Sequence, residues 1–102
     1  SEDLTVSNES ITETPSAIEL HQNYPNPFNP ATTIKYQLPV SGEVSLKVFD
    51  MLGREVATLV NERVSAGTHE VSFDASNLSS GLYFYRLDAH GFVETRQMTL
   101  IK

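Results

Sequence analysis

Three histidines are the side chains best suited to chemistry in this 102-residue chain, but their spacing suits neither catalysis nor metal binding. His21, His69 and His90 lie far apart, and none belongs to a His-x-His or His-x-x-x-His pair that would place two imidazoles on one ion. The chain has no cysteine, which excludes thiol catalysis, disulfide bonds and thiolate zinc sites. We therefore interpret the histidines as solvated or capping side chains and predict neither a metal nor a cofactor.

Patterns typical of other catalytic sites are also missing. No serine lies in a Gly-x-Ser-x-Gly elbow, no glycine-rich loop suits a phosphate, and nothing marks two carboxylates as an acid and base pair. Asp50-x-x-Gly53 and Asp88-x-x-Gly91 each offer one carboxylate, whereas a calcium ion takes roughly six to eight oxygen ligands. We predict that both segments are turns and that the chain is not an enzyme.

Aromatic side chains offer an alternative function, because they could stack on sugar rings as in a carbohydrate-binding module. Aromatic residues inside strands more often form the core and cross-strand pairs. Only exposed aromatic side chains would support sugar binding, so it stays an alternative at this point. The aromatic residues concerned are Tyr24, Phe28, Tyr36, Tyr83 and Tyr85.

The negative charge of the chain is concentrated near its start. The net charge is −6, and residues 1–17 hold four carboxylates and no basic residue. This segment is too polar to bury enough surface to offset chain entropy, so we predict a flexible polar linker over 1–17 and one folded domain over 18–102. The folded part is nearly neutral and has no basic stripe, which argues against nucleic-acid binding.

Runs of strand-like sequence alternate with turn signals from Ile18 onward, at intervals of about 8–14 residues that are typical of a sandwich or barrel. We predict an all-β fold of about seven antiparallel strands in two packed sheets. The expected strands cover 18–20, 33–38, 44–49, 54–60, 69–74, 82–87 and 92–101. Alternation predicts an inward face made of Ile34, Tyr36, Leu38, Val44, Leu46, Val48, Val71 and Phe73.

The connections follow from turn residues. Three prolines exclude 24–30 from a central ladder, so we expect a rigid, ordered loop with Phe28 as a plug. The nearly continuous apolar run over 82–87 indicates a central strand that is covered on both faces. We also expect a bulge near Thr95, type I turns at 50–53 and 88–91, a polar connection over 62–67 and at most one helical turn over 75–80.

Three segments resemble the type A C-terminal sorting domain of the type IX secretion system. Residues 23–34 are similar to the opening motif of this family, residues 48–56 to its central hairpin and residues 78–87 to its Gly-x-Tyr strand. The tail that ends at Lys102 is similar to the terminal strand of the family. The match spans about residues 18–102 and implies an immunoglobulin-like β-sandwich.

The resemblance implies that the domain is a sorting signal attached to a larger protein. Such a domain follows an upstream cargo domain, passes through the periplasm and is recognised by the outer-membrane type IX translocon. A sortase-like peptidase typically removes it, which leaves the cargo secreted or on the cell surface. The chain starts in a polar segment without a methionine, so we expect it to be the end of a longer protein, with residues 1–17 accessible for cleavage.

We expect the recognised patch to lie near the C-terminal strand. The candidate residues are Pro25, Asn26, Pro27, Phe28, Asn29, Pro30, Gly53, Arg54, Gly81, Tyr83, Met98, Leu100 and Lys102. Each also has a structural alternative, since Gly53 and Gly81 suit positive φ and Tyr83 suits the core. Immunoglobulin-like domains of hook-capping proteins share the Asp-x-x-Gly-Arg hairpin and the Gly-x-Tyr strand, which leaves an assembly module as a further alternative.

Overall fold

Residues 17–102, which the computed structural model describes, form seven strands because apolar side chains recur at every second position along most of them. The strands are β1 (Glu19–Leu20), β2 (Ala31–Leu38), β3 (Gly42–Phe49), β4 (Glu55–Val64), β5 (Gly67–Asp74), β6 (Gly81–Ala89) and β7 (Phe92–Leu100). The linker predicted over 1–17 lies outside the described residues, apart from Ala17. No helix within 17–102 is long and apolar enough to cross a membrane.

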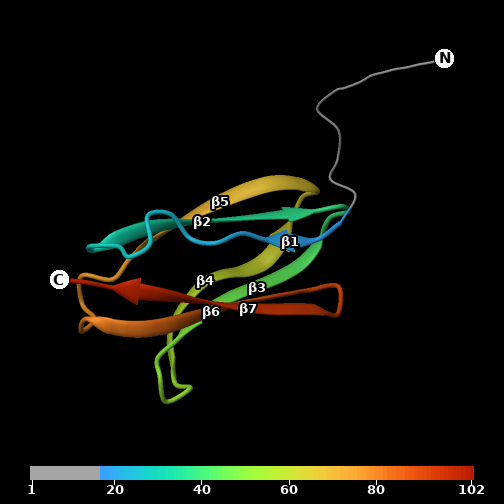
Figure 1. Cartoon of the computed structure of the whole chain (residues 1–102). Helices are drawn as coiled ribbons and strands as arrows, with labels where there is room; N and C mark the ends of the chain where they lie inside the picture. Colours follow the sequence, from blue (N-terminus) through green and yellow to red (C-terminus); the bar gives the residue numbers. More distant parts are fainter. Residues whose placement is uncertain (1–16) are drawn as a thin grey trace.

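Two antiparallel sheets pack face to face (Figure 1). One sheet has the order β1-β2-β5 and the other has the order β4-β3-β6-β7. This confirms the predicted all-β sandwich of seven strands. In an immunoglobulin-like sandwich the first, second and fifth strands share one sheet, and the third, sixth and seventh share the other. The present fold follows that order, with β4 added beside β3.

The core lies between the two inner faces. The second and third strands bury the alternating residues that the sequence predicted, from Ile34 through Leu38 and from Val44 through Val48. β6 contributes Tyr83, Tyr85 and Leu87, which are buried from the same direction. Burial of each large aliphatic or aromatic side chain stabilises the fold by about 1.5–3 kcal/mol, so these strands dominate its stability.

β6 is a central strand, as predicted, but only one of its faces is fully covered. Its outer face carries Phe84, which is half-buried, and Arg86, which is exposed. The Arg86 guanidinium lies 4.7 Å from the centroid of the Phe49 ring and shields it from water. An apolar run can therefore arise from one buried face and one face that is covered mainly by a long cationic side chain.

The hairpin between β6 and β7 differs from the predicted Asp-x-x-Gly turn. Asp88 stays in β6 opposite Val93, and only His90 and Gly91 form the loop. Both have positive φ, 54° and 78°, which is the pattern of a type I′ turn. This turn matches the right-handed twist of the strands, and strand twist therefore decides the turn type here, whereas the spacing of Asp and Gly does not.

The prediction of a polar connection between the fourth and fifth strands was also wrong. The polar segment 62–67 is mostly strand, because β4 continues to Val64 and β5 begins at Gly67. β4 is an edge strand, so Glu62 and Arg63 can point into solvent without leaving the ladder. The pairing between β4 and β3 shifts register twice, between Leu46 and Lys47 and between Val48 and Phe49.

The bulge expected near Thr95 is absent, because β7 pairs with β6 without interruption from Phe92 to Leu100. Its inner face carries Met98 and Leu100 at one end and the charged pair Glu94 and Arg96 at the other. Arg96 Nη2 lies 3.2 Å from Glu94 Oε2, and Arg96 Nε donates a 2.8 Å hydrogen bond to the Leu20 carbonyl. The bulge was expected because Val93 and Ile101 alternate out of phase with Met98 and Leu100, but both are exposed, so no change of register is required.

Candidate recognition surface

In Figure 1 the proline loop, the 75–80 loop and the end of the chain lie at one end of the sandwich, and the hairpin between β3 and β4 projects from the same half of the domain. The register explains this, because Ala31 pairs with Asp74, Phe49 pairs with Phe84 and Gly81 pairs with Leu100. The starts of β2 and β6 therefore lie beside the ends of β3, β5 and β7. We call this region the motif end and define it as residues 24–30, 50–53, 75–80 and 101–102.

The proline loop is ordered by a buried network behind it. Asn23 Nδ2 donates to the Pro25 carbonyl and to Thr32 Oγ1, both at 3.1 Å, and Thr32 Oγ1 donates to the Pro25 carbonyl at 2.8 Å. The Phe28 ring is buried and lies 6.2 Å from the Phe73 ring, centroid to centroid. The prediction of an ordered loop with Phe28 as a plug is confirmed.

The C-terminal residues are held from two sides. Phe28 N donates to the Thr99 carbonyl and Ile101 N donates to the Phe28 carbonyl, both at 2.9 Å. On the other side Lys102 N donates to Ser80 Oγ at 3.0 Å, and Lys102 Nζ donates to the Ser76 carbonyl at 2.7 Å. The chain therefore ends in a fixed position at the motif end.

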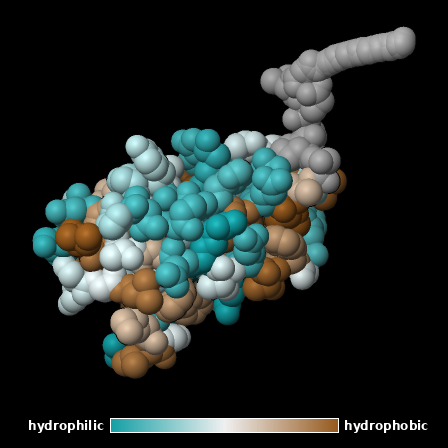
Figure 2. Space-filling view, viewed as in Figure 1, coloured by the Kyte–Doolittle hydropathy of each residue, from teal (hydrophilic) through white to brown (hydrophobic). Residues whose placement is uncertain are grey.

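The turn between β3 and β4 is rigid and has an apolar tip. Gly53 N donates to the Asp50 carbonyl at 3.0 Å, and Gly53 has a φ of 83°, which confirms the predicted turn. Met51 and Leu52, at the tip, are 68% and 78% exposed. Figure 2 shows apolar atoms at the tip of this projecting hairpin. Exposed apolar side chains on an ordered turn are typical of a contact site.

Asp50 organises this turn. Asp50 Oδ1 accepts hydrogen bonds from Leu52 N and Arg54 N, each at 2.9 Å, and Asp50 Oδ2 lies 2.8 Å from Arg54 Nε. The hydrogen bond from the Arg54 amide is the main cause that holds the pKa of Asp50 below its ordinary value of 3.8, and the Arg54 guanidinium adds to it. The carboxylate is thus charged at neutral pH, and the ion pair holds the Arg54 side chain at the edge of the motif end.

A shallow groove of about 250 Å³ joins the second and third motifs. Asp50–Leu52 and Arg54 line one side, and Ser79–Tyr83 lines the other. Gly81 has a φ of 152°, and the Tyr83 hydroxyl donates to the Ser79 carbonyl at 2.7 Å. The hydrogen bond from Tyr83 to Ser79 is the tyrosine corner of immunoglobulin-like sandwiches, in which a tyrosine near the start of the sixth strand fixes the preceding loop.

The candidate residues fall into an exposed group and a buried group. Phe28, Tyr83, Met98 and Leu100 belong to the core, so their structural alternative is the one that the geometry supports. Gly81 is half-buried in the groove. The exposed candidates are Pro25, Asn26, Pro27, Asn29, Pro30, Gly53, Arg54 and Lys102. Sequence reasoning missed Met51, Leu52 and Ile101 as candidates, although apolar residues within a turn were a usable signal.

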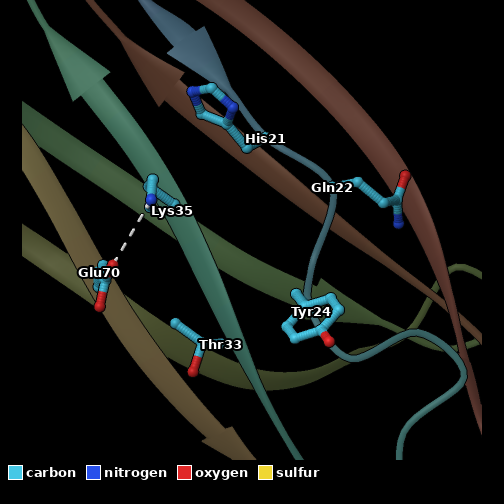
Figure 3. Close-up of a pocket in the computed structure, with 6 residues that line it drawn as sticks. All are labelled: His21, Gln22, Tyr24, Thr33, Lys35 and Glu70. Carbon is cyan, nitrogen blue, oxygen red and sulfur yellow. Dashed lines mark ion pairs between the residues drawn. The ribbon is translucent and has the colours of Figure 1, made fainter.

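A second groove, of about 420 Å³, lies on the outer face of the three-stranded sheet (Figure 3). It is lined by His21, Gln22, Tyr24, Thr33, Lys35 and Glu70. Lys35 Nζ lies 3.7 Å from Glu70 Oε2, so the two charges neutralise each other. Glu70 is the one carboxylate that lines this groove, so the groove holds no pair of carboxylates for acid–base catalysis. No group of three metal-ligating side chains occurs anywhere within residues 17–102.

The aromatic side chains do not form a platform for sugars. Phe28, Tyr36, Tyr83 and Tyr85 are buried, and of the five residues considered only Tyr24 is exposed. Stacking on a sugar ring requires exposed aromatic faces. The geometry therefore gives no support to the carbohydrate-binding alternative.

The fold defines the class of protein as an immunoglobulin-like β-sandwich whose sequence motifs gather at one end. Residues 22–102 match the family model described as the secretion system C-terminal sorting domain, so the chain belongs to this family. Its members are the C-terminal sorting signals of the type IX secretion system. The resemblance seen in the sequence is therefore confirmed, and the hook-cap alternative loses its basis.

Solved structures with a similar fold include a component of the type IX system itself. A part of PorZ, described as an essential bacterial surface component of the type IX secretion system of human oral-microbiomic Porphyromonas gingivalis, superposes with a TM-score of 0.55 and 21% identity. The match covers 83% of the present chain and 11% of that chain. No curated protein sequence matches the chain. At this identity the likeness shows a shared fold.

Family membership defines the role of the domain in general terms. It directs an attached cargo into type IX secretion and so interacts with that machinery. The protein passes through the periplasm and becomes secreted or bound to the cell surface. Domains of this family are not known as catalysts.

Proposed function

We propose that the outer-membrane translocon recognises the domain by binding to the motif end. The observation that carries this proposal is the register, which gathers three motifs from distant parts of the sequence and the last two residues on one surface. The large apolar or aromatic side chains exposed there are Tyr24, Met51, Leu52 and Ile101. Aromatic residues, methionine and arginine are enriched at the centre of protein interfaces, and Met51 and Arg54 fit this composition.

The rigidity of this surface favours binding. Asp50 holds the turn through two main-chain hydrogen bonds, and Lys102 is held by the 75–80 loop. Side chains on a preorganised backbone lose less conformational freedom on binding, so more of the contact energy appears as affinity. The proposed signal is therefore a folded patch, and a short linear peptide would not reproduce it.

The attached cargo would not cover this patch. The chain enters the fold at the opposite end, where Glu19 pairs with Gln37 one residue before β2 ends at Leu38. We infer that the domain itself performs no chemistry and that a sortase-like peptidase cuts within residues 1–17, upstream of β1. Because the described chain enters the fold at the end opposite the motif end, cleavage upstream of β1 and recognition would not compete for one surface.

The test is export of a reporter. The 102-residue chain is fused behind a signal peptide and a reporter protein and expressed in a cell with a working type IX system. The chain carries Met51→Glu and Leu52→Glu together, and the matched control carries Val40→Glu, a 55% exposed apolar residue at the opposite end. We expect export to fall about tenfold in the tip variant, the effect of losing roughly 1.4 kcal/mol of contact, and to stay normal in the control.

Two outcomes count against the proposal, and they are separable. A wild-type fusion that stays in the periplasm would reject the sorting function of this chain. A tip variant that is exported as well as the control would reject the motif end as the recognised surface. Thermal unfolding of each purified chain shows whether the variants are folded. Loss of the domain from the exported reporter shows that a peptidase has cleaved the fusion.

A further inference from the structure

The outer edge of β7 is covered near its end, although β7 is an edge strand. Thr99 and Ile101 direct main-chain groups away from β6, and Thr99 O and Ile101 N bond to the main chain of Phe28. The Thr99 amide donates to Asn26 Oδ1 at 3.0 Å. Three polar groups that would otherwise be open for pairing with another chain are thus satisfied by the proline loop.

The same segment follows β7 further back. Gln22 Nε2 donates to the Gln97 carbonyl at 2.8 Å, and in Figure 3 Gln22 extends from the segment that follows β1. Arg96 Nε donates to the Leu20 carbonyl. Phe28 and Leu100 form a parallel bridge. Residues 20–28 therefore run alongside the second half of β7, from Arg96 to Leu100, and bond to it at several points.

This neighbour is fixed to the core independently of β7. The Phe28 ring is buried beside Phe73, and the Pro30 carbonyl accepts a 2.8 Å hydrogen bond from Ala75 N. Asn23 and Thr32 are buried and bonded to the Pro25 carbonyl. The loop can therefore hold the end of β7 in place, because its own position does not depend on that end.

We infer that Asn26 and Phe28 are positioning residues that clasp the C-terminal strand and set the place of Thr99–Lys102 at the motif end. Phe28 supplies two main-chain bonds and a buried anchor, and Asn26 supplies one side-chain acceptor. The consequence for export rests on the proposed function. If the translocon binds the motif end, the motif Pro-Asn-Pro-Phe contributes to recognition by holding the C-terminal strand in place. Asn26 therefore needs no contact with the translocon.

Hydrogen exchange of the 102-residue chain tests the clasp directly. In Asn26→Ala the Thr99 amide loses its acceptor, and its protection factor should fall about fivefold, which corresponds to one hydrogen bond of ordinary strength. Asn26→Asp keeps an acceptor at the same place and should restore protection. Asn29→Ala is the matched control, because Asn29 is exposed and has no side-chain hydrogen bond within residues 17–102.

The Glu94 amide, which lies in the same strand opposite Leu87, should exchange at the same rate in all these chains. Unchanged protection of Thr99 in Asn26→Ala, or an equal loss in Asn29→Ala, would overturn the clasp. Failure of Asn26→Asp to restore protection would also overturn it. A merely structural role would instead raise the exchange of Glu94 and Thr99 together.

Export of the reporter fusion tests the consequence. Asn26→Ala should lower export, whereas Asn26→Asp and the Val40→Glu control outside the motif end should not, although Met51, Leu52, Arg54 and Lys102 are intact in all three. If exchange responds as expected and export does not change, positioning of the C-terminal residues is not needed for recognition. If the wild-type fusion is not exported, the proposed function fails and the exchange data alone decide on the clasp.

Discussion

At the residue scale, the Tyr85 hydroxyl links the two sheets through the middle of the core. It donates a 2.7 Å hydrogen bond to the His21 carbonyl and accepts a 2.8 Å hydrogen bond from Asn23 N. The side chain is fully buried in β6, while both partners belong to the segment that follows β1. Without the hydroxyl, the buried Asn23 amide and the partly buried His21 carbonyl would both lose their partner.

Tyr85→Phe keeps the ring and removes only the hydroxyl. We expect the free energy of unfolding to fall by about 1–3 kcal/mol, because a buried donor and a buried acceptor lose their partner. Urea unfolding measures the change. Tyr24→Phe is the control, because Tyr24 is 81% exposed, and it should change stability by less than about 0.5 kcal/mol. Equal stability of the two variants would contradict the assignment.

The same residue gives a dependence on pH. Burial raises the pKa of Tyr85 from 10.0 to about 12. The unfolded chain loses this proton near its ordinary pKa, so the stabilisation from Tyr85 is complete below pH 10 and is lost as the pH rises toward 12. Between these values the free energy of unfolding of the wild-type chain should fall more steeply than that of Tyr85→Phe. Equal slopes would mean that the hydroxyl is not buried as described.

Single residues also show what the sequence could not decide. Alternation predicts that Met98 and Leu100 share a face, but it cannot tell whether that face is read by a partner or buried. The geometry places them in the core with Phe28 and Tyr83. Conversely, the role of Asn26 depends on a hydrogen bond to a residue 73 positions away, which no local pattern predicts.

At the scale of elements, β7 is the strand that connects the core to the motif end. Its inner face contributes Met98 and Leu100 to the core, and its outer edge is covered by residues 20–28. The sequence predicted that the last strand belongs to the core, and the structure confirms this. The bulge near Thr95 was predicted because Val93 and Ile101 fall on the opposite face from Met98 and Leu100, but both side chains are exposed, so β7 needs no change of register.

Leu100→Ala should lower the free energy of unfolding by about 2–5 kcal/mol, because it leaves a cavity between the sheets at the end of β7. Its neighbour provides the control, since Ile101 is 51% exposed and Ile101→Ala should cost less than about 0.5 kcal/mol. Chemical denaturation of both chains gives the comparison. Similar losses in the two would show that β7 is not fixed in the register described here.

Turns and strand ends separate what local sequence can predict from what it cannot. The Asp50–Gly53 turn was predicted correctly, because its hydrogen bonds join only residues of the contiguous segment 50–54. The 88–91 turn was predicted wrongly, because the pairing of β6 with β7 sets its conformation. The length of β4 depends likewise on its pairing with β3, which is a long-range property.

At the scale of the whole molecule, the sandwich places the entry of the chain and the proposed recognition surface at opposite ends. The chain enters at one end beside the end of β2, and the motif end lies at the other, where the last residues are held (Figure 1). The all-β class and the family were predictable, because composition, alternation and three motifs pointed to them together. The gathering of these motifs on one surface was not, because it follows from strand register.

The central claim is that the domain is a signal only when its C-terminal strand closes the fold. The most direct test compares the fraction of a reporter found outside the cell for the 102-residue chain and for a chain that ends at Gln97, with the periplasmic pool measured in parallel. We predict that the complete chain is exported and that the shortened chain accumulates in the periplasm or is degraded there. Export of the shortened chain at the rate of the complete one would contradict the account.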